Sequence, residues 1–127
     1  MTERKSSAAS CIDALLNKDA FLPHLQTFLA AHPEGQWCVA AIDVEHFKLY
    51  NEWYGLQKGD ALLEALAACL LDYQTRTNCP AGYFGNDDFF VCLPDEDTAI
   101  YELYHKLQAC VDQNETGVSF YVAMGVC

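Results

Sequence analysis

Two aspartates far apart in the chain could share one metal ion. Asp43 directly follows an apolar run over residues 37–42, and Asp87 lies in a polar turn between two further apolar runs. If these runs form neighbouring strands, both carboxylates reach the same edge of a sheet. Two carboxylates and a backbone carbonyl supply the hard oxygen ligands that suit Mg²⁺ or Mn²⁺ with phosphate oxygens, as phosphoryl transfer requires. The alternative is that both are ordinary strand-end and turn residues.

Helices and strands must alternate along the chain to position these carboxylates. Apolar periodicity predicts helices over residues 19–31, 46–53, 58–73 and 97–111. Short apolar runs predict strands over residues 37–42, 80–84, 88–93 and 118–126, of which we expect the first to be buried on both faces. The turn at Gly85 and Asn86 predicts a hairpin between the second and third strands. This order predicts an α+β, ferredoxin-like palm: a sheet containing antiparallel strands, flanked by helices.

The composition limits the partners and the location of the protein. The 127 residues suffice for one domain, and the net charge of −11 argues against binding to nucleic acid. A polyphosphate could still bind through a metal cation. No apolar run is long enough for a membrane segment, and we expect a cytoplasmic protein. The seven cysteines, an odd number without a Cys-x-x-Cys pair, are expected to be reduced and to pack as small apolar groups.

Three segments resemble the GGDEF (diguanylate cyclase-type) family in matching order and spacing. Residues 43–60 resemble the motif D-x-D-x-F-K-x-x-N-D-x-x-G-H-x-x-G-D, and residues 84–94 resemble the Y-G-G-D-E-F hairpin with its downstream L-P. Residues 12–21 are similar to L-T-G-L-x-N-R-x-x-F. The resemblance implies a nucleotidyl cyclase-like GGDEF fold over residues 10–127, after a flexible lead-in at 1–9. It also implies that the C-terminal part of the domain, with its K-x-x-G-R-N region, is missing.

The resemblance implies a reaction and the residues that would carry it out. The family condenses two GTP molecules into cyclic di-GMP, with one GTP on each half of a homodimer. Carried over by position, Asp43, the carbonyl of Val44 and Asp87 would bind the Mg²⁺ or Mn²⁺ ions. Asp88 stands in the place of the family's catalytic Glu.

The same resemblance implies residues that contact GTP. Asn51 and Asp60 would read the guanine edge, since an amide and a carboxylate complement its donors and acceptors. Lys48 would face the phosphates, and Gly85 and Asn86 would lie beside the nucleotide. Asn51 could equally be a surface amide of a helix, and Asp60 a carboxylate favoured by a helix N-terminus.

Departures from the motifs bear on activity. Asn86 replaces a glycine and adds a side chain where the nucleotide would pass, and Asp88 is one methylene shorter than Glu. Misplacement on that scale can slow a reaction about a hundredfold. Of the product-inhibition motif R-x-x-D, Arg76 is present but Cys79 replaces the aspartate.

These departures favour one function over two others. The resemblance and its departures together predict a degenerate regulatory GGDEF module that binds GTP and metal weakly and makes little or no cyclic di-GMP. Modules of this kind often regulate an attached EAL-type phosphodiesterase domain, so the resemblance also implies such a partner domain. The alternatives are an active diguanylate cyclase that tolerates Asp88, and a ligand-free protein-interaction or dimerisation domain.

Overall fold

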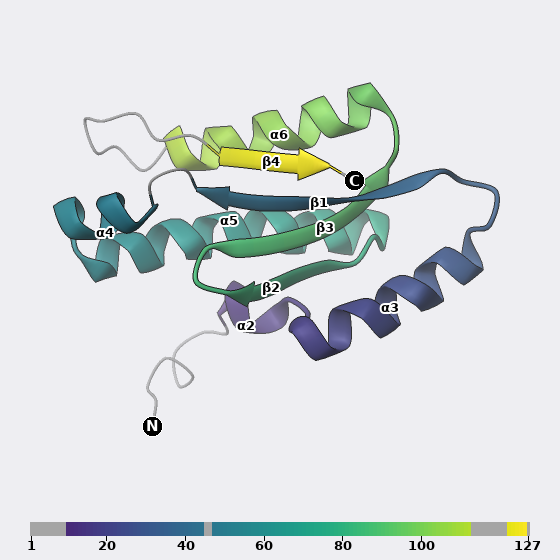
Figure 1. Cartoon of the computed structure of the whole chain (residues 1–127), viewed down its shortest axis with the longest axis horizontal. Coiled ribbons are helices and arrows are strands. Elements are labelled where there is room, and N and C mark those ends of the chain that lie inside the picture. Colours follow the sequence, from purple (N-terminus) through teal and green to yellow (C-terminus); the bar gives the residue numbers. More distant parts are fainter. Residues whose placement is uncertain (1–9, 45–46, 113–121, 127) are drawn as a thin grey trace.

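The computed structural model describes residues 10–44, 47–112 and 122–126. Within these residues one sheet has the strand order β2-β3-β1-β4, and every neighbouring pair is antiparallel (Figure 1). The strands are β1 (Trp37–Val44), β2 (Ala81–Gly85), β3 (Asp88–Pro94) and β4 (Val122–Val126). The expected α+β architecture with an antiparallel sheet and flanking helices is confirmed.

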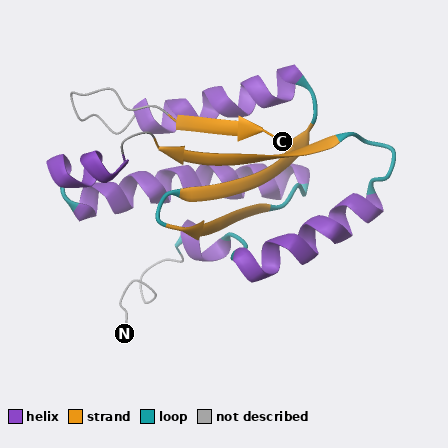
Figure 2. Cartoon of the chain, viewed as in Figure 1, coloured by secondary structure: helices purple, strands orange, loops and turns teal. Residues whose placement is uncertain are grey.

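Helices cover one face of the sheet and part of the other. They are α2 (Cys11–Ala14), α3 (Lys18–Ala31), α4 (Phe47–Tyr54), α5 (Leu56–Thr77) and α6 (Asp97–Asp112). The long helices α5 and α6 lie side by side across one face, whereas α3 lies beside the β2 edge (Figure 2). None of the described helices combines the length and the apolar composition needed to cross a membrane.

The main core lies between the sheet and helices α5 and α6. Ile42 and Val44 of β1 point into it, as do Phe89 and Val91 of β3. From α5 the core receives the buried side chains of Leu62, Leu63, Leu66, Ala67 and Leu70. Because these side chains pack against α5 and α6, they fix the position of β1 in the molecule and therefore the position of its C-terminal end, which carries Asp43.

The prediction that β1 is buried on both faces is wrong. Its side chains alternate, and Ala41 and Asp43 are exposed on the face away from α5. Helix α3 covers that face near the β2 edge, where the Phe21 ring lies 5.7 Å from Phe84 and 6.5 Å from Phe90. It also covers the start of β1, where Phe28 meets Trp37. An antiparallel sheet can leave one face partly open to water, which an apolar run in the sequence cannot reveal.

Two helical features differ from the sequence prediction. Helix α2 was not expected, since four residues carry no readable periodicity and cannot form a stable helix alone. The Glu64 carboxylate accepts hydrogen bonds from the Ser10 hydroxyl and the Cys11 amide, which holds the start of α2 against α5. Helix α5 is longer than the predicted 58–73, and the residue that caps its C-terminal end, Asn78, adopts a left-handed conformation with φ 67°. Residues 1–9 and 118–121, in the predicted lead-in and last strand, lie outside the described residues.

Candidate functional site

The end of β1 and the tip of the β2–β3 hairpin lie side by side. The β1–β3 register runs as far as the pair Ile42 and Phe89, just before both segments reach the polar residues. One carboxylate oxygen of Asp87 accepts a hydrogen bond from the Val44 amide, with a nitrogen–oxygen distance of 3.0 Å. The end of β1 and the hairpin tip are therefore neighbours, which is one condition of the metal-site hypothesis.

The hairpin turn has a backbone conformation that its residues favour. Gly85 has φ 112° and Asn86 has φ 50°, the left-handed region that glycine and asparagine tolerate best. The Tyr83 hydroxyl donates to the Asn86 carbonyl at 2.6 Å and holds the turn closed. Asparagine at the second position of the turn thus preserves the backbone of a glycine-containing hairpin while adding a side chain.

A cleft of about 500 Å³ lies between helix α4 and the hairpin tip. Its lining residues are Phe47, Lys48, Asn51, Asn86 and Asp87. Lys48 gives this cleft a cation, whereas the chain as a whole is strongly acidic. A ligand that enters here would meet one ammonium group, one half-buried carboxylate and two amides, a set suited to a polar, anionic molecule.

Helix α4 is attached to the main core by the side chain of Tyr50. Tyr50 is almost completely buried, and its ring stacks on that of Phe47 with 6.3 Å between centroids. Burial raises the pKa of the Tyr50 phenol, so the group stays neutral at physiological pH. The anchored helix holds Lys48 and Asn51 over the cleft.

Asn51 depends on a glycine in the next helix for its position. A methyl group added at Gly59 would lie 1.7 Å from Asn51 Oδ1 and 3.4 Å from the Phe47 ring. That amide oxygen is buried and has no hydrogen-bond partner among the described residues. An unpaired buried oxygen lowers the stability of the folded protein. The packing around Asn51 therefore holds its amide in a position that costs free energy when no ligand is bound.

The remaining predicted site residues lie around the cleft without lining it. Asp43 is exposed at the end of β1, Asp88 is exposed at the start of β3, and Asp60 is exposed in the first turns of α5. Gly85 is half-buried in the turn. Of the nine predicted residues, the structure brings Lys48, Asn51, Asn86 and Asp87 together in one cleft, with Val44 bonded to Asp87.

The oxygen atoms at the end of β1 and in the hairpin turn suit a divalent cation that is bound by the protein and by a phosphate-containing molecule together. No group of three or more His, Cys, Asp or Glu side chains that could hold a metal is found in the part of the chain that the structure describes. Mg²⁺ is commonly bound through only one or two carboxylates, with phosphate and water oxygens completing its shell. Asp87 fits this role, because its Val44 hydrogen bond fixes the carboxylate and leaves the second oxygen available.

Comparison with known proteins identifies the family. The model of the diguanylate cyclase GGDEF domain matches residues 11–127. The chain belongs to the GGDEF family. A curated relative of this GGDEF domain, the uncharacterized protein YhcK of Bacillus subtilis, is 35% identical over 63 residues, which are 50% of this chain and 17% of the relative. The chain spans about half the length, or less, of the curated relatives it matches.

Solved structures with the same fold include two that bind cyclic di-GMP. The coiled coil and GGDEF domain of DgcB from Caulobacter crescentus, in complex with cyclic di-GMP, is 22% identical with a TM-score of 0.71, covering 97% of this chain and 69% of that one. The S helix-GGDEF-EAL chain of LapD from Vibrio cholerae, also bound to cyclic di-GMP, is 21% identical with a TM-score of 0.65. That match covers 97% of this chain and 29% of LapD. At these identities the likeness concerns the fold.

The residues at the product-inhibition motif have other partners in this GGDEF domain. Arg76 forms an exposed ion pair with Asp72, one helical turn earlier in α5, at 2.9 Å. Cys79 is buried and packs with Phe28 and Cys92. This buried side chain lacks the solvent access that an aspartate at a surface ligand site would need.

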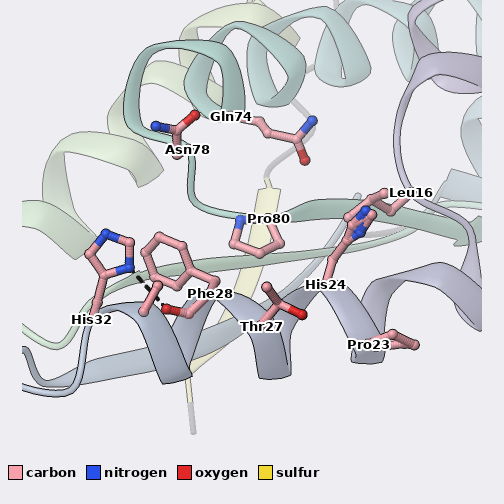
Figure 3. A pocket seen from close by; sticks show the side chains of 10 residues that line it. Leu16, Pro23, His24, Thr27, Phe28, His32, Gln74, Asn78 and Pro80 are labelled. Carbon is pink, nitrogen blue, oxygen red and sulfur yellow. Dashed lines mark hydrogen bonds between the residues drawn. The ribbon is translucent and has the colours of Figure 1, made fainter.

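A second and larger groove lies at the opposite end of the molecule, between α3 and the end of α5. It has a volume of about 660 Å³. Figure 3 shows its walls, with the His32 and Phe28 side chains on one side and His24 and Leu16 on the other. The lining residues are Leu16, Pro23, His24, Thr27, Phe28, Ala31, His32, Gln74, Asn78 and Pro80.

Sequence reasoning missed two parts of the site. It placed Gly59 in a motif but gave it no role, because the clash with Asn51 becomes visible only when α4 and α5 are packed together. It also gave the Val44 carbonyl a place in the metal site but did not foresee that the Val44 amide donates a hydrogen bond to Asp87. The spacing of the glycine and the asparagine, eight residues apart across a helix break at Gly55, was the available signal.

Proposed function

We propose that this chain is a degenerate regulatory GGDEF module of cyclic di-GMP signalling. It binds GTP with Mg²⁺ or Mn²⁺ weakly and makes little or no cyclic di-GMP. The observation that carries the proposal is the cleft at the hairpin tip, where the Asp87 carboxylate is bonded to the Val44 amide while the Asn86 side chain lies on the cleft wall. The cleft thus has the charged groups that would hold a metal ion and phosphates, and the Asn86 side chain takes up space where the nucleotide would enter.

The metal-binding part of the proposal rests on the oxygen groups at the end of β1. Asp87, Asp43 and the Val44 carbonyl would hold a divalent cation together with the GTP phosphates. When bound, the cation neutralises phosphate charge. Lys48 adds a second cation from the opposite wall of the cleft.

Base recognition would fall to Asn51 and Asp60. Rotation of the Asn51 amide would turn its unpaired oxygen away from Gly59 and towards the cleft, where a guanine N–H could donate to it. Asp60, on the following turn of α5, would accept from the remaining guanine donors. A hydrogen bond from a base to this buried oxygen would add to the binding free energy in two ways. It forms a new bond, and it removes the cost that the unbound protein carries for the unpaired oxygen.

The weak point of the proposed reaction is Asp88. It is exposed at the start of β3, so its backbone position is set by the hairpin and its reach by the side chain alone. The carboxylate of Asp ends one methylene short of the position that Glu would reach, and activation of a 3′-hydroxyl requires hydrogen-bond contact. Gly85 and Asn86 would contact the nucleotide through the turn backbone.

The direct test is to incubate the chain with GTP and Mg²⁺ or Mn²⁺ and to measure both calorimetric binding and cyclic di-GMP formation. The proposal expects measurable GTP binding and little or no product. Robust product would establish the active cyclase instead. Absence of binding heat at high GTP, with no product, would favour the ligand-free interaction domain.

Restoring the family residues sharpens the test. In the double variant Asn86→Gly/Asp88→Glu we expect cyclic di-GMP formation to appear or rise, because the entrance widens and the acid reaches further. The single variant Asn86→Gly is the matched control and should improve binding more than turnover. A double variant that binds GTP well and still makes no product would show that the defect lies elsewhere than in these two positions.

The partners of the longer protein are part of the proposal. LapD, which shares this fold, joins its GGDEF domain to an EAL domain. We propose a similar neighbouring phosphodiesterase-type domain here, regulated by GTP at the cleft, and assembly of this chain into a homodimer. Sedimentation of the chain with and without GTP tests dimer formation, and a monomer at all concentrations would exclude the dimer for this segment.

A further inference from the structure

Two cysteine thiols meet where helices α5 and α6 pack together, and neither of them lines the candidate cleft. Cys69 lies near the middle of α5, and Cys110 lies in the last turn of α6. The Cys69 thiol donates a hydrogen bond to the Cys110 sulfur, and both side chains are half-buried. Folding has therefore brought together two thiols that are 41 positions apart in the sequence.

The two thiols share a surface groove of about 700 Å³. The groove is lined by Ala65, Ala68, Cys69, Asp72, Lys106, Ala109 and Cys110. Its alanines leave room above the sulfur atoms and let the two helices approach closely, since the distance between packed helices depends on the side chains at the contact. Small water-soluble molecules can therefore reach this pair.

We propose that Cys69 and Cys110 are a reversible oxidation site that forms a disulfide between α5 and α6 when the protein meets hydrogen peroxide. Both side chains line one groove between two packed helices and are hydrogen-bond partners, so each sulfur is within reach of the other once one of them is oxidised. The bond would lock the packing of the two helices that cover the main core.

The chemistry proceeds in two balanced steps. The Cys110 thiolate attacks one oxygen of hydrogen peroxide, the O–O bond breaks, and a sulfenic acid forms while the departing hydroxide takes up a proton as water. The Cys69 sulfur then attacks the sulfenic sulfur, the S–O bond breaks, and the released hydroxide takes the Cys69 proton to give a second water. Two thiols are oxidised to one disulfide, and one peroxide is reduced to two waters.

The surroundings determine which thiol reacts first. The hydrogen bond from Cys69 lowers the pKa of Cys110 to about 7, against the opposing effect of burial, so a large fraction is thiolate at neutral pH. The same hydrogen bond, with burial, raises the pKa of Cys69. Among charged neighbours, Lys106 favours a thiolate at Cys69 and Asp72 opposes it.

A second thiol pair provides an internal comparison. Cys79 and Cys92 are also hydrogen-bonded, and contact with Cys92 first, then with Thr77 and Tyr73, lowers the pKa of Cys79 to about 6. These two side chains are only 2% and 0% exposed. Acidity is thus similar in both pairs, and access to the solvent distinguishes them.

The test treats the full chain with hydrogen peroxide, alkylates the remaining thiols and maps the peptides by mass spectrometry. We expect a Cys69–Cys110 linkage that a dithiol reductant reverses, with Cys79 and Cys92 still alkylated after denaturation. In Cys69→Ser, Cys110 should stop at a sulfenic acid that dimedone traps. The variant Cys79→Ser is the matched control and should form the Cys69–Cys110 linkage at the unchanged rate.

A thermal measurement gives a second readout that does not need a variant. Closing a covalent loop between residues 69 and 110 should raise the melting temperature of the oxidised chain by about 5 °C or more. The proposal is overturned if both thiols remain alkylatable after peroxide treatment, or if the buried pair or an intermolecular bond forms first.

Discussion

The two ends of the molecule hold cavities of similar size but opposite character. The groove beside α3 is the larger, at about 660 Å³, and two of its polar side chains have hydrogen-bond partners within the protein. His32 Nδ1 lies 2.9 Å from the Phe28 carbonyl, and Gln74 Oε1 accepts from the Ala81 amide at 2.8 Å. The cleft at the hairpin tip is smaller, at about 500 Å³, and contains the unpaired amide oxygen of Asn51.

This difference indicates what each end contributes. Around the larger groove, Phe28 stacks on His32 with 4.3 Å between ring centroids and meets Trp37 at 4.8 Å, so α3 is held by aromatic packing. At the hairpin tip, a carboxylate, an ammonium group and amide side chains line one cleft, and the buried oxygen of Asn51 has no hydrogen-bond partner among the described residues. Unsatisfied polar groups mark a binding site better than cavity volume does, because a ligand can repay their cost.

The largest expected effect is on stability, at the α3 end. Replacing Phe28 by alanine removes a buried ring and should lower the free energy of unfolding by about 3 kcal/mol. Urea unfolding measures this, and GTP affinity at the other end should not change. The matched control Leu22→Ala, at a residue 56% exposed on the same helix, should cost no more than about 0.5 kcal/mol. An equal loss of GTP affinity in Phe28→Ala would mean that the two ends are not independent.

The next effect is on binding, at the hairpin tip. Asp87→Asn keeps an acceptor for the Val44 amide but removes the charge, so we expect Mg²⁺-dependent GTP affinity to fall about tenfold or more. The free energy of unfolding should change by less than about 1 kcal/mol. Calorimetry with GTP and Mg²⁺ measures the first, and Asp95→Asn, at an exposed carboxylate beyond the other end of β3, controls for charge. Unchanged affinity would remove Asp87 from the proposed site.

A smaller effect should follow from filling the space beside Asn51. Gly59→Ala places a methyl group against the amide oxygen, so Asn51 must move and GTP affinity should fall about threefold. The free energy of unfolding should stay nearly constant, because alanine favours the helix by about 1 kcal/mol over glycine and this gain offsets the cost of displacing Asn51. In an Asn51→Ala background the same change should cost no affinity, and a cycle of the four proteins measures this coupling. Additive effects would contradict the proposed positioning role.

The smallest effect concerns Glu64, which lies between the two ends on α5. Burial raises the pKa of this carboxyl, but hydrogen bonds from Cys11 and Ser10 outweigh burial, and the net pKa is lowered from 4.5. The charged form therefore adds stability above about pH 4.5, and this contribution is lost as the pH falls through the lower folded-state pKa. Glu64→Gln should flatten the pH dependence of unfolding in that acidic range while sparing GTP binding, whereas Glu102→Gln, at an exposed site, should not. An unaltered pH profile would show that the carboxylate contributes nothing there.

Much of the architecture could be predicted because it follows local patterns. The alternation of helices and strands, the hairpin at Gly85 and Asn86, and the placement of the end of β1 beside the hairpin tip all follow from apolar periodicity and turn chemistry. The prediction of a fully buried β1 failed because coverage of the second face depends on where α3 lies. Helix α2 was missed because a partner on another helix, Glu64, stabilises it.

The sequence by itself determined the family, the order of the elements and the residue types available for chemistry, since these are written in motifs and short-range spacing. Only the tertiary structure decided that Gly59 makes room for Asn51, that the Asp87 carboxylate bonds to the Val44 amide, and that the thiols of Cys69 and Cys110 meet. The physical reason is that such contacts depend on how helices and strands pack in space. Residues 8, 43 and 41 positions apart become neighbours only when hydrophobic burial fixes that packing.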